Sequence, residues 1–144
     1  MKEKSVCMII PSLSSGGAER VVSILVSALA EQGREMYLIV HRHAKTEYPV
    51  SDKVKVLFLD ECRVSGIRAI ARIQRLLAVR RFIKTNKIDY AVPFLDSCMK
   101  HTYLATRGLK CSLISTLRNN PYERTKKESE ECDAIAEKAA ANFV

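Results

Sequence analysis

The sequence predicts a doubly wound α/β domain, in which helices cover both faces of a parallel sheet. Short apolar, β-capable runs alternate with helical patterns along the 144 residues, and this alternation is typical of βαβ units. Gly33 and Gly108 each follow a helical pattern, at the place where a left-handed C-cap is usual. The length favours one domain with a sizeable core, and a composition of 47% hydrophobic and 28% charged residues fits an ordinary globule.

The first predicted unit is a strand, a glycine loop and a helix. Residues 5–10 are mostly apolar, as in a strand buried on both faces of a parallel sheet. A helix then runs to Gly33, with apolar residues recurring three and four apart. Gly16 and Gly17 allow positive φ and a close approach of a ligand to the backbone, at a helix N-terminus that attracts phosphate or carboxylate. The alternative is that the two glycines only make the turn, and their spacing fits neither the dinucleotide fingerprint nor the P-loop.

Further strands and helices are expected along the rest of the chain. The expected strands cover 35–41, 54–60, 89–95 and 111–117. The expected helices cover 67–87, 96–107 and 134–141, and residues 142–144 look like the start of a sixth strand. The chain is therefore expected to stop within the fold. The helix over 67–87 is expected to turn Ile70, Ile73, Leu77 and Phe82 or Ile83 to the core, with Leu76 beside them.

The helix over 67–87 is rich in basic side chains and has no acidic one. Like charges four residues apart destabilise a helix slightly, so the charge indicates a use. An anionic lipid surface attracts each basic side chain by about 1 kcal/mol. We therefore expect membrane-surface contacts at Arg68, Arg72, Arg75, Arg80, Arg81 and Lys84. The alternative is a solvated outer face.

Polar residues follow the expected strands at positions where a ligand crevice forms in parallel sheets. Asp96 and Ser97 follow one strand, and Arg118 and Asn119 follow another. The planar fork of Arg118 suits phosphate or carboxylate. Asp96 could instead be only a helix cap, and Arg118 could form an internal salt bridge. His41 and His43 are expected at a solvated strand end, because no third metal ligand lies near them in sequence.

Composition excludes several classes of protein. The five cysteines are scattered without C-x-x-C spacing, which argues against a zinc site or a disulfide framework and favours a reducing cytoplasm. No apolar run reaches the roughly 18 residues of a membrane span, and no signal peptide is expected. The net charge of +8 indicates a polyanionic partner, unless it serves solubility alone. Nucleic acid is not expected, because no RNA- or DNA-binding pattern is present.

Residues 9–22, Ile-Ile-Pro-Ser-Leu-Ser-Ser-Gly-Gly-Ala-Glu-Arg-Val-Val, resemble the start of a family 4 glycosyltransferase, as does Leu-Ala-Glu-Gln-Gly at 29–33. The Gly-Gly-Ala-Glu-Arg variant resembles bacterial members that build surface polysaccharides on lipid carriers. Phe94-Leu95 and Arg-Asn-Asn-Pro-Tyr at 118–122 also resemble segments of that subgroup, the second its Ser-x-Arg-Asn-x-Pro segment. The resemblance extends over the whole chain, which corresponds to the N-terminal half of such an enzyme.

The resemblance implies a GT-B fold, made of two Rossmann-like domains that face each other across a cleft. Residues 1–144 would form the N-terminal, acceptor-side domain, cut before the domain that holds most of the donor. The full enzyme would move a sugar, with retention, from a nucleotide-sugar to a saccharide or lipid-linked acceptor. It would need no metal or other cofactor. The protein would be cytoplasmic, at the inner face of the plasma membrane.

The resemblance also implies roles for the residues singled out above. Gly16 and Gly17 would meet the donor phosphates. The acceptor side of the cleft would be lined by Glu19, Arg20, Asp96, Ser97, Arg118 and Asn119. Many relatives have a histidine where Arg118 stands, so no catalytic residue is carried over, and His101 is a poor substitute on sequence grounds. The 144 residues alone are expected to lack transferase activity and to self-associate through a cut sheet edge.

Two hypotheses from other classes stay open at this point. One is a stand-alone phosphate- or nucleotide-binding Rossmann domain, complete as written. The other is a basic nucleic-acid-binding domain, driven by the net charge of +8. A reading frame that continues into a second α/β domain would favour the transferase, and a salt-dependent gel shift with oligonucleotides would favour the last.

Overall fold

Apolar, β-branched runs form a parallel sheet in the structure, a computed structural model that describes residues 4–14, 16–116 and 126–141. Within those residues the sheet has five strands in the order β3-β2-β1-β4-β5. The strands are β1 (Val6–Ile10), β2 (Met36–Val40), β3 (Lys55–Phe58), β4 (Tyr90–Pro93) and β5 (Ser112–Leu113). The helices are α1 (Gly17–Glu31), α2 (Arg68–Thr85), α3 (Asp96–Thr106) and α4 (Lys126–Ala141).

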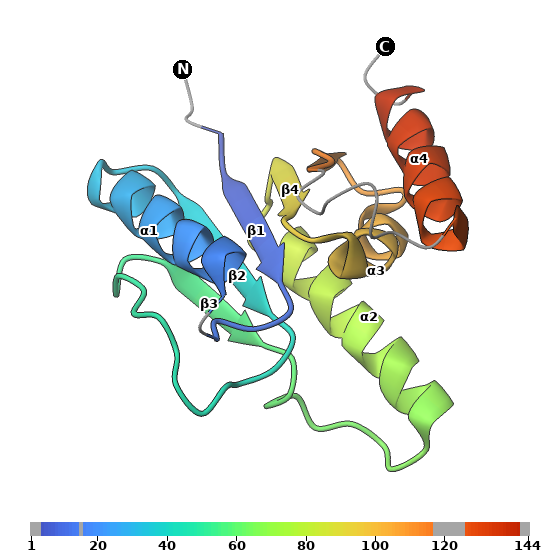
Figure 1. Cartoon of the computed structure of the whole chain (residues 1–144), viewed down its shortest axis with the longest axis horizontal. Coiled ribbons are helices and arrows are strands. Elements are labelled where there is room, and N and C mark those ends of the chain that lie inside the picture. The colour runs from blue at the N-terminus through green and yellow to red at the C-terminus, as the bar shows by residue number, and fades with distance from the viewer. Residues whose placement is uncertain (1–3, 15, 117–125, 142–144) are drawn as a thin grey trace.

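The sheet is covered on both faces, which confirms the predicted fold class. Alternate side chains of β1 point to opposite faces: Met8 and Ile10 pack with α1, while Cys7 and Ile9 pack with the helices of the other face. That second layer contains α2 and α3, and Ile135 of α4 joins it. Figure 1 shows α1 on one side of the sheet and α2 and α3 on the other.

The strand order reverses between β1 and β4. The chain moves outward from β1 to β2 and β3, and it then returns to the other side of β1 with β4 and β5. β1 therefore pairs in parallel with both β2 and β4, with Val6 opposite Met36 and Tyr90. Ligands of open α/β sheets bind outside the carboxyl ends of the strands at such a reversal. The loops after β1 and β4 meet this condition.

At the amino ends of the strands, the Asp89 side chain links the residue before β4 to the residues before β1. Its carboxylate accepts hydrogen bonds from the Ser5 backbone N–H (2.9 Å) and the Ser5 hydroxyl (3.1 Å). Lys4 forms an ion pair with the same side chain at 3.6 Å. Asp89 thus fixes the start of β4 against the start of β1, the two strands between which the order reverses.

Three expectations from the sequence need correction. Three of the residues expected to face the core from 67–87 are exposed, with Ile70 at 42%, Ile73 at 57% and Leu77 at 52% exposure. The buried side chains of α2 are instead Ala71, Val79 and Ile83. The expected core residue Ile83 is correct, and Phe82 and Leu76 are partly buried beside it.

The other two corrections concern the C-terminal part. α4 begins at Lys126, eight residues before the helix expected over 134–141. β5 contains only Ser112 and Leu113, at the start of the strand expected over 111–117. After β5, Thr116 still contacts β4, because its hydroxyl donates to the Pro93 carbonyl at 2.7 Å. The expected sixth strand over 142–144 lies outside the described residues.

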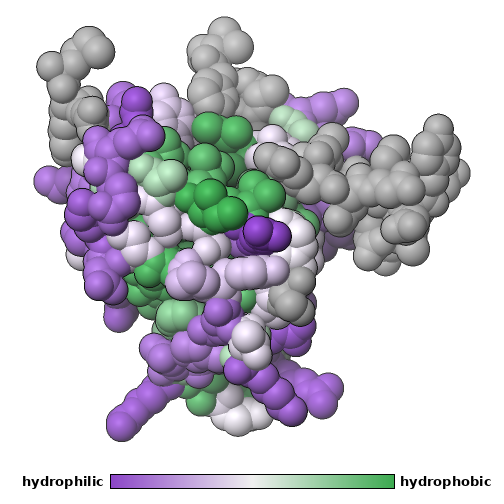
Figure 2. All heavy atoms as spheres, turned by 60° about the vertical axis from the view of Figure 1, so that its left-hand side comes forward, coloured by the Kyte–Doolittle hydropathy of each residue, from purple (hydrophilic) through white to green (hydrophobic). Residues whose placement is uncertain are grey.

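Large hydrophobic side chains remain on the surface of α1 and α2. On α1 these are Val21, Ile24 and Leu25. Figure 2 shows one face on which hydrophobic atoms form a continuous patch bordered by hydrophilic side chains. Among the described helices, none combines the length and the apolar composition that crossing a bilayer requires.

Candidate functional site

The glycine loop lies at the carboxyl end of β1, as the predicted site requires. α1 begins at Gly17, and Gly16 is its N-cap residue, with φ −82° and ψ 162° and no side-chain cap. Neither Gly16 nor Gly17 has positive φ; the described glycines that do are Gly33 and Gly108. The positive φ that these two glycines allow is therefore not used at Gly16 or Gly17, whereas the two expected C-cap glycines have the left-handed conformation.

The Glu19 carboxylate lies close to Gly16, but it is the end of a flexible side chain, so neither φ nor space requires a glycine there. A Cβ atom at Gly16 would collide with the Glu19 carboxylate, which lies against the Gly16 backbone, whereas a Cβ at Gly17 would meet nothing within 4 Å. An acidic side chain in the first turn is favourable at the positive end of a helix. Glu19 therefore occupies the place where a donor phosphate is expected to bind. A phosphate could bind there only after the Glu19 side chain has turned away.

Arg20 lies apart from Ser97, another predicted cleft residue. It is exposed and lines an open groove of about 830 Å³ along the outer side of α1, together with Ile24, Tyr48 and Asp52. The loop that forms the other wall of this groove is held to α1 because the hydroxyl of Ser23 donates to the Pro49 carbonyl. Arg20 and Ser97 line different surface depressions.

A separate cavity of about 560 Å³ lies beside the carboxyl ends of the strands, between α2, α3 and the loop that precedes α2. Its polar and charged lining residues are His41, Ser65, Arg68, Arg72, Arg75, Ser97 and His101. Leu59 and Ala71 contribute apolar walls. Among the described residues, no aspartate or glutamate lines this cavity. We call it the His–Arg cavity.

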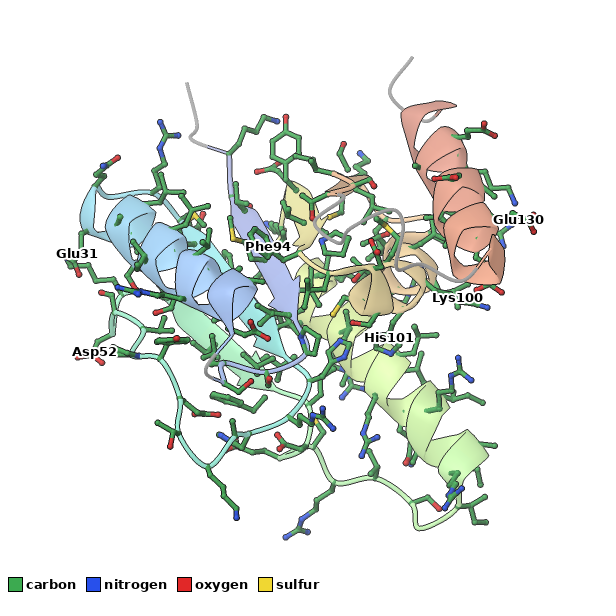
Figure 3. All side chains as sticks on the ribbon, in the orientation of Figure 1. Glu31, Asp52, Phe94, Lys100, His101 and Glu130 are labelled. Carbon is green, nitrogen blue, oxygen red and sulfur yellow. The ribbon has the colours of Figure 1, made fainter. Side chains whose placement is uncertain are left out.

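Two histidines meet in the His–Arg cavity. His41 follows β2, and its backbone N–H donates to the carbonyl of Ile10 at the end of β1. His101 comes from α3, and the two rings pack edge to face with centroids 5.4 Å apart. Nε2 of His41 and Nδ1 of His101 are buried and have no hydrogen-bond partner. Figure 3 shows His101 where α3 approaches α2, near the strand ends.

The environment disfavours the charged form of both rings. Burial, His101 and Arg75 together lower the pKa of His41 to about 4. Burial lowers the pKa of His101 too, with Arg72 and Arg75 contributing in the same direction. Both histidines are therefore neutral near pH 7 in the absence of a bound anion.

These two histidines were not identified as site residues from the sequence. The expected solvated strand end is correct for His43, which is exposed, stacks on Phe58 at 3.8 Å and contacts Glu61 at 2.9 Å. It is wrong for His41, which is partly buried. The available signal was spacing: His101 comes four residues after Ser97, so both lie on one face of a helix.

The other predicted site residues divide into three groups. Asp96 and Ser97 begin α3, and Ser97 alone of the two lines the cavity. Arg80 donates to the carbonyls of Ala105 (3.1 Å) and Arg107 (2.7 Å), so it caps the end of α3. Arg118 and Asn119 lie outside the described residues.

Those described residues also contain no group of three His, Cys, Asp or Glu side chains that could hold a metal ion.

The chain is similar to a curated bacterial transferase. Over 117 residues it is 31% identical to the Campylobacter jejuni "GalNAc-alpha-(1->4)-GalNAc-alpha-(1->3)-diNAcBac-PP-undecaprenol alpha-1,4-N-acetyl-D-galactosaminyltransferase". The match covers 80% of this chain and 32% of that protein, so the chain spans about a third of the length of this relative. No family model matches the chain.

Solved structures share the fold. Sucrose-phosphate synthase from Thermosynechococcus elongatus superposes with a TM-score of 0.64 at 12% identity, covering 92% of this chain and 40% of that one. A glycosyltransferase from Rickettsia africae gives a TM-score of 0.55 at 14% identity, covering 84% and 32%. WaaG, a glycosyltransferase involved in lipopolysaccharide biosynthesis, gives 0.50 at 11%, covering 90% and 41%. The single Rossmann-like domain described here thus matches less than half of each of these chains.

Proposed function

We propose that this chain is the N-terminal, acceptor-side half of a retaining glycosyltransferase of family 4, which moves a hexosyl group from a nucleotide-sugar to a saccharide or lipid-linked acceptor in polysaccharide biosynthesis. The observation that carries the proposal is the 31% identity over 117 residues to a transferase whose name specifies an undecaprenol-linked acceptor. The shared fold of the glycosyltransferase structures is consistent with it.

In this proposal the two sides of the strand reversal have different tasks. The backbone at Gly16 and Gly17 approaches the phosphates of the donor, and the Glu19 carboxylate must first leave the Gly16 backbone. Asp96 and Ser97 begin α3 after β4, and we assign them to the acceptor side together with Arg118 and Asn119, which lie outside the described residues. Fixed donors and the dipole of α1 would stabilise the leaving diphosphate, and stabilisation of this kind accounts for much of the rate enhancement in many enzymes.

The activity is tested with a chimera. This chain replaces the third of the Campylobacter relative that it matches, and transfer from a nucleotide-sugar to a lipid-linked acceptor is measured. We expect transfer by the chimera and none by the 144 residues alone, because half a cleft positions only one substrate and admits water. Arg118→Ala should lower the chimera's rate, and Arg63→Ala, at an exposed loop residue, should not.

Two outcomes would contradict the proposal. One is a chimera that melts cooperatively but transfers no sugar to any lipid-linked or free saccharide offered. The other is robust turnover by the 144 residues alone, which would point to a domain that needs no second half.

We propose in addition that α2 contacts an anionic membrane. Figure 1 shows the N-terminal part of α2 extending past the carboxyl edge of the sheet. Its outer face carries the exposed Ile70, Ile73 and Leu77, followed by the basic Arg81 and Lys84. Apolar residues beside basic ones are typical of a helix that lies in the headgroup region. Arg80, which caps α3, does not take part in this surface.

Vesicle binding tests the membrane contact. Sedimentation with phosphatidylglycerol vesicles should detect binding that weakens as salt rises. Ile73→Ser should reduce it, because Ile73 is 57% exposed on the outer face of α2. Leu104→Ser is the matched control, since Leu104 is 43% exposed on α3. Equal losses in both variants, or no binding at low salt, would remove this part of the proposal.

A further inference from the structure

The outer and inner faces of the projecting part of α2 have opposite character. Arg68, Arg72 and Arg75 are spaced four and three apart, and the next residue on that face is the fully buried Val79. The face of α2 that packs against the sheet further along is therefore the face that presents arginines beyond the sheet edge. All three arginines line the His–Arg cavity.

The His–Arg cavity gathers positive charge without a lining carboxylate among the described residues. In the part of the chain that the structure describes, none of the salt bridges involves Arg68, Arg72 or Arg75. Asp96 lies in the first turn of α3 but does not line the cavity. Guanidinium groups around a concave site focus a positive potential there, which raises the local concentration of anions.

Two helix N-termini open onto the same cavity. Gly66 and Arg68 bring the start of α2 to it, and Ser97 brings the start of α3. The N-cap residues are Ile67 and Leu95, and neither helix has a side-chain cap. Each of these termini presents backbone N–H groups and the positive end of a helix dipole. The first turn of α2 has no acidic residue, whereas that of α3 contains Asp96, so α2 contributes the more positive of the two ends. Helix ends of this kind bind phosphate well.

From these observations we infer that the His–Arg cavity is a binding site for a phosphoryl group, which is held by Arg72 and Arg75 and contacted by the rings of His41 and His101. The two buried ring nitrogens without partners belong to rings whose centroids are 5.4 Å apart, in the same cavity as the arginines. Arginine forks match the oxygens of a phosphate in pairs. The site differs from the glycine loop, where the Glu19 carboxylate occupies the helix end.

Anion binding in this cavity is coupled to proton uptake. A bound dianion favours the imidazolium form, so it raises the pKa of both rings, which burial and the arginines hold low in the empty cavity. The affinity should therefore rise as the pH falls. The charged and titratable groups that line the cavity are Arg68, Arg72, Arg75, His41 and His101. Arg72 and Arg75 disfavour protonation of the rings in the empty cavity, and a bound dianion offsets this repulsion.

Titration of the 144-residue protein with inorganic phosphate tests the site, with histidine ring resonances as the readout. We expect saturable shifts of His41 and His101 and none of His43, which contacts Glu61 outside the cavity. Arg72→Gln/Arg75→Gln should weaken binding about tenfold or more. Arg81→Gln/Lys84→Gln removes the same charge from the outer face and should change affinity less than about twofold.

Sulfate separates proton coupling from the ionisation of phosphate itself. Its affinity should increase from about pH 7.5 to about pH 5.5 in the wild type and stay nearly constant in His41→Asn/His101→Asn. Dihexanoyl phosphatidic acid and glycerol 1-phosphate then distinguish a lipid headgroup from a free phosphate ester. Tighter binding of the first assigns the site to a lipid phosphate, and equal binding assigns it to a soluble one.

The inference is overturned if phosphate leaves the two ring resonances unmoved, or if the inner and outer double variants lose affinity equally. No donor, acceptor or transfer step enters these measurements. A protein that transfers sugar but leaves this cavity empty would refute only the phosphoryl site. A protein that binds phosphate here without supporting transfer in the chimera would refute only the proposed function.

Discussion

The neutral state of His41 makes the stability of the fold depend on pH. The pKa of His41 is lowered to about 4 in the folded chain, against roughly 6.5 for a free histidine. Between these values the unfolded chain binds more protons, so the free energy of unfolding falls as the pH drops through that window. Between about pH 7 and about pH 5, the free energy of unfolding should fall by roughly 1–2 kcal/mol less in His41→Asn than in the wild type. Urea unfolding at the two pH values measures this difference.

His43 provides a control of opposite sign. Its pKa is raised, mainly by the hydrogen bond to Glu61, so its contribution is present at low pH and is lost as the pH rises through the raised value. His43→Asn should therefore steepen the acid loss, where His41→Asn makes it shallower. Equal dependence of stability on pH in the two variants would contradict both the lowered pKa of His41 and the raised pKa of His43.

Asp89 is a second residue whose substitution should lower the stability of the fold. Its pKa is lowered, first by the backbone N–H of Ser5, so its contribution is present above the ordinary carboxyl pKa and is lost as the pH falls through the lowered one. Asp89→Asn should cost about 1–2 kcal/mol in urea at neutral pH. Lys4→Gln, which removes only the exposed ion pair at 3.6 Å, should cost a few tenths at most.

Residues that bond to near neighbours were the easier ones to predict. Gly33 and Gly108 were expected as left-handed caps and have φ values of 88° and 73°. The burial of His41 is not predictable in this way, because its partner His101 lies sixty residues away in the chain. Sequence spacing carries no information about such a contact until the topology is known.

At the scale of the element, α2 shows why an apolar stripe need not be a core face. Two stripes run along this helix, and the larger one, Ile70, Ile73 and Leu77, faces outward. Burial of the smaller stripe, Ala71, Val79 and Ile83, depends on where the sheet ends beneath the helix. That position is set by tertiary structure and is absent from the helical period.

The two stripes predict opposite responses to substitution. Val79→Ala should cost about 2 kcal/mol of unfolding free energy, because Val79 is completely buried. Ile73→Ser should cost less than about 0.5 kcal/mol, because the side chain is already 57% exposed. Thermal melts of the two variants check this. A larger loss of stability in Ile73→Ser than in Val79→Ala would show that the outer stripe is part of a core.

Helix and strand limits were less predictable than the elements themselves. α4 begins at Lys126 because lysine and glutamate are good helix formers, so a charged stretch does not have to be a loop. β5 contains only two residues, although the apolar run that predicted it is longer. Ser112 and Leu113 pair with Tyr90 and Ala91, so β5 ends two residues before β4 does. The last residue of β4 is Pro93, which has no N–H to donate to a longer ladder.

At the scale of the whole molecule, the alternation of strands and helices was sufficient to predict a parallel sheet covered on both faces. The strand order β3-β2-β1-β4-β5 was not predicted, because buried strands carry similar apolar runs. The His–Arg cavity follows from that order. Its residues come from segments near 41, 68–75 and 97–101, which meet only once β4 has returned to the other side of β1.

The contact between Arg80 and the end of α3 divides α2 into two lengths with different local stability. Past Arg80 the helix is tied down by the Ala105 and Arg107 carbonyls and by buried Ile83. Before it, the turns around Ile70 and Ile73 have few apolar neighbours to oppose fraying. Amide deuteration should therefore be at least about tenfold faster near Ile73 than near Ile83, as peptide-level mass spectrometry can measure. Binding of a lipid or a phosphate to the N-terminal turns of α2 should slow amide exchange there first, and less toward Arg80.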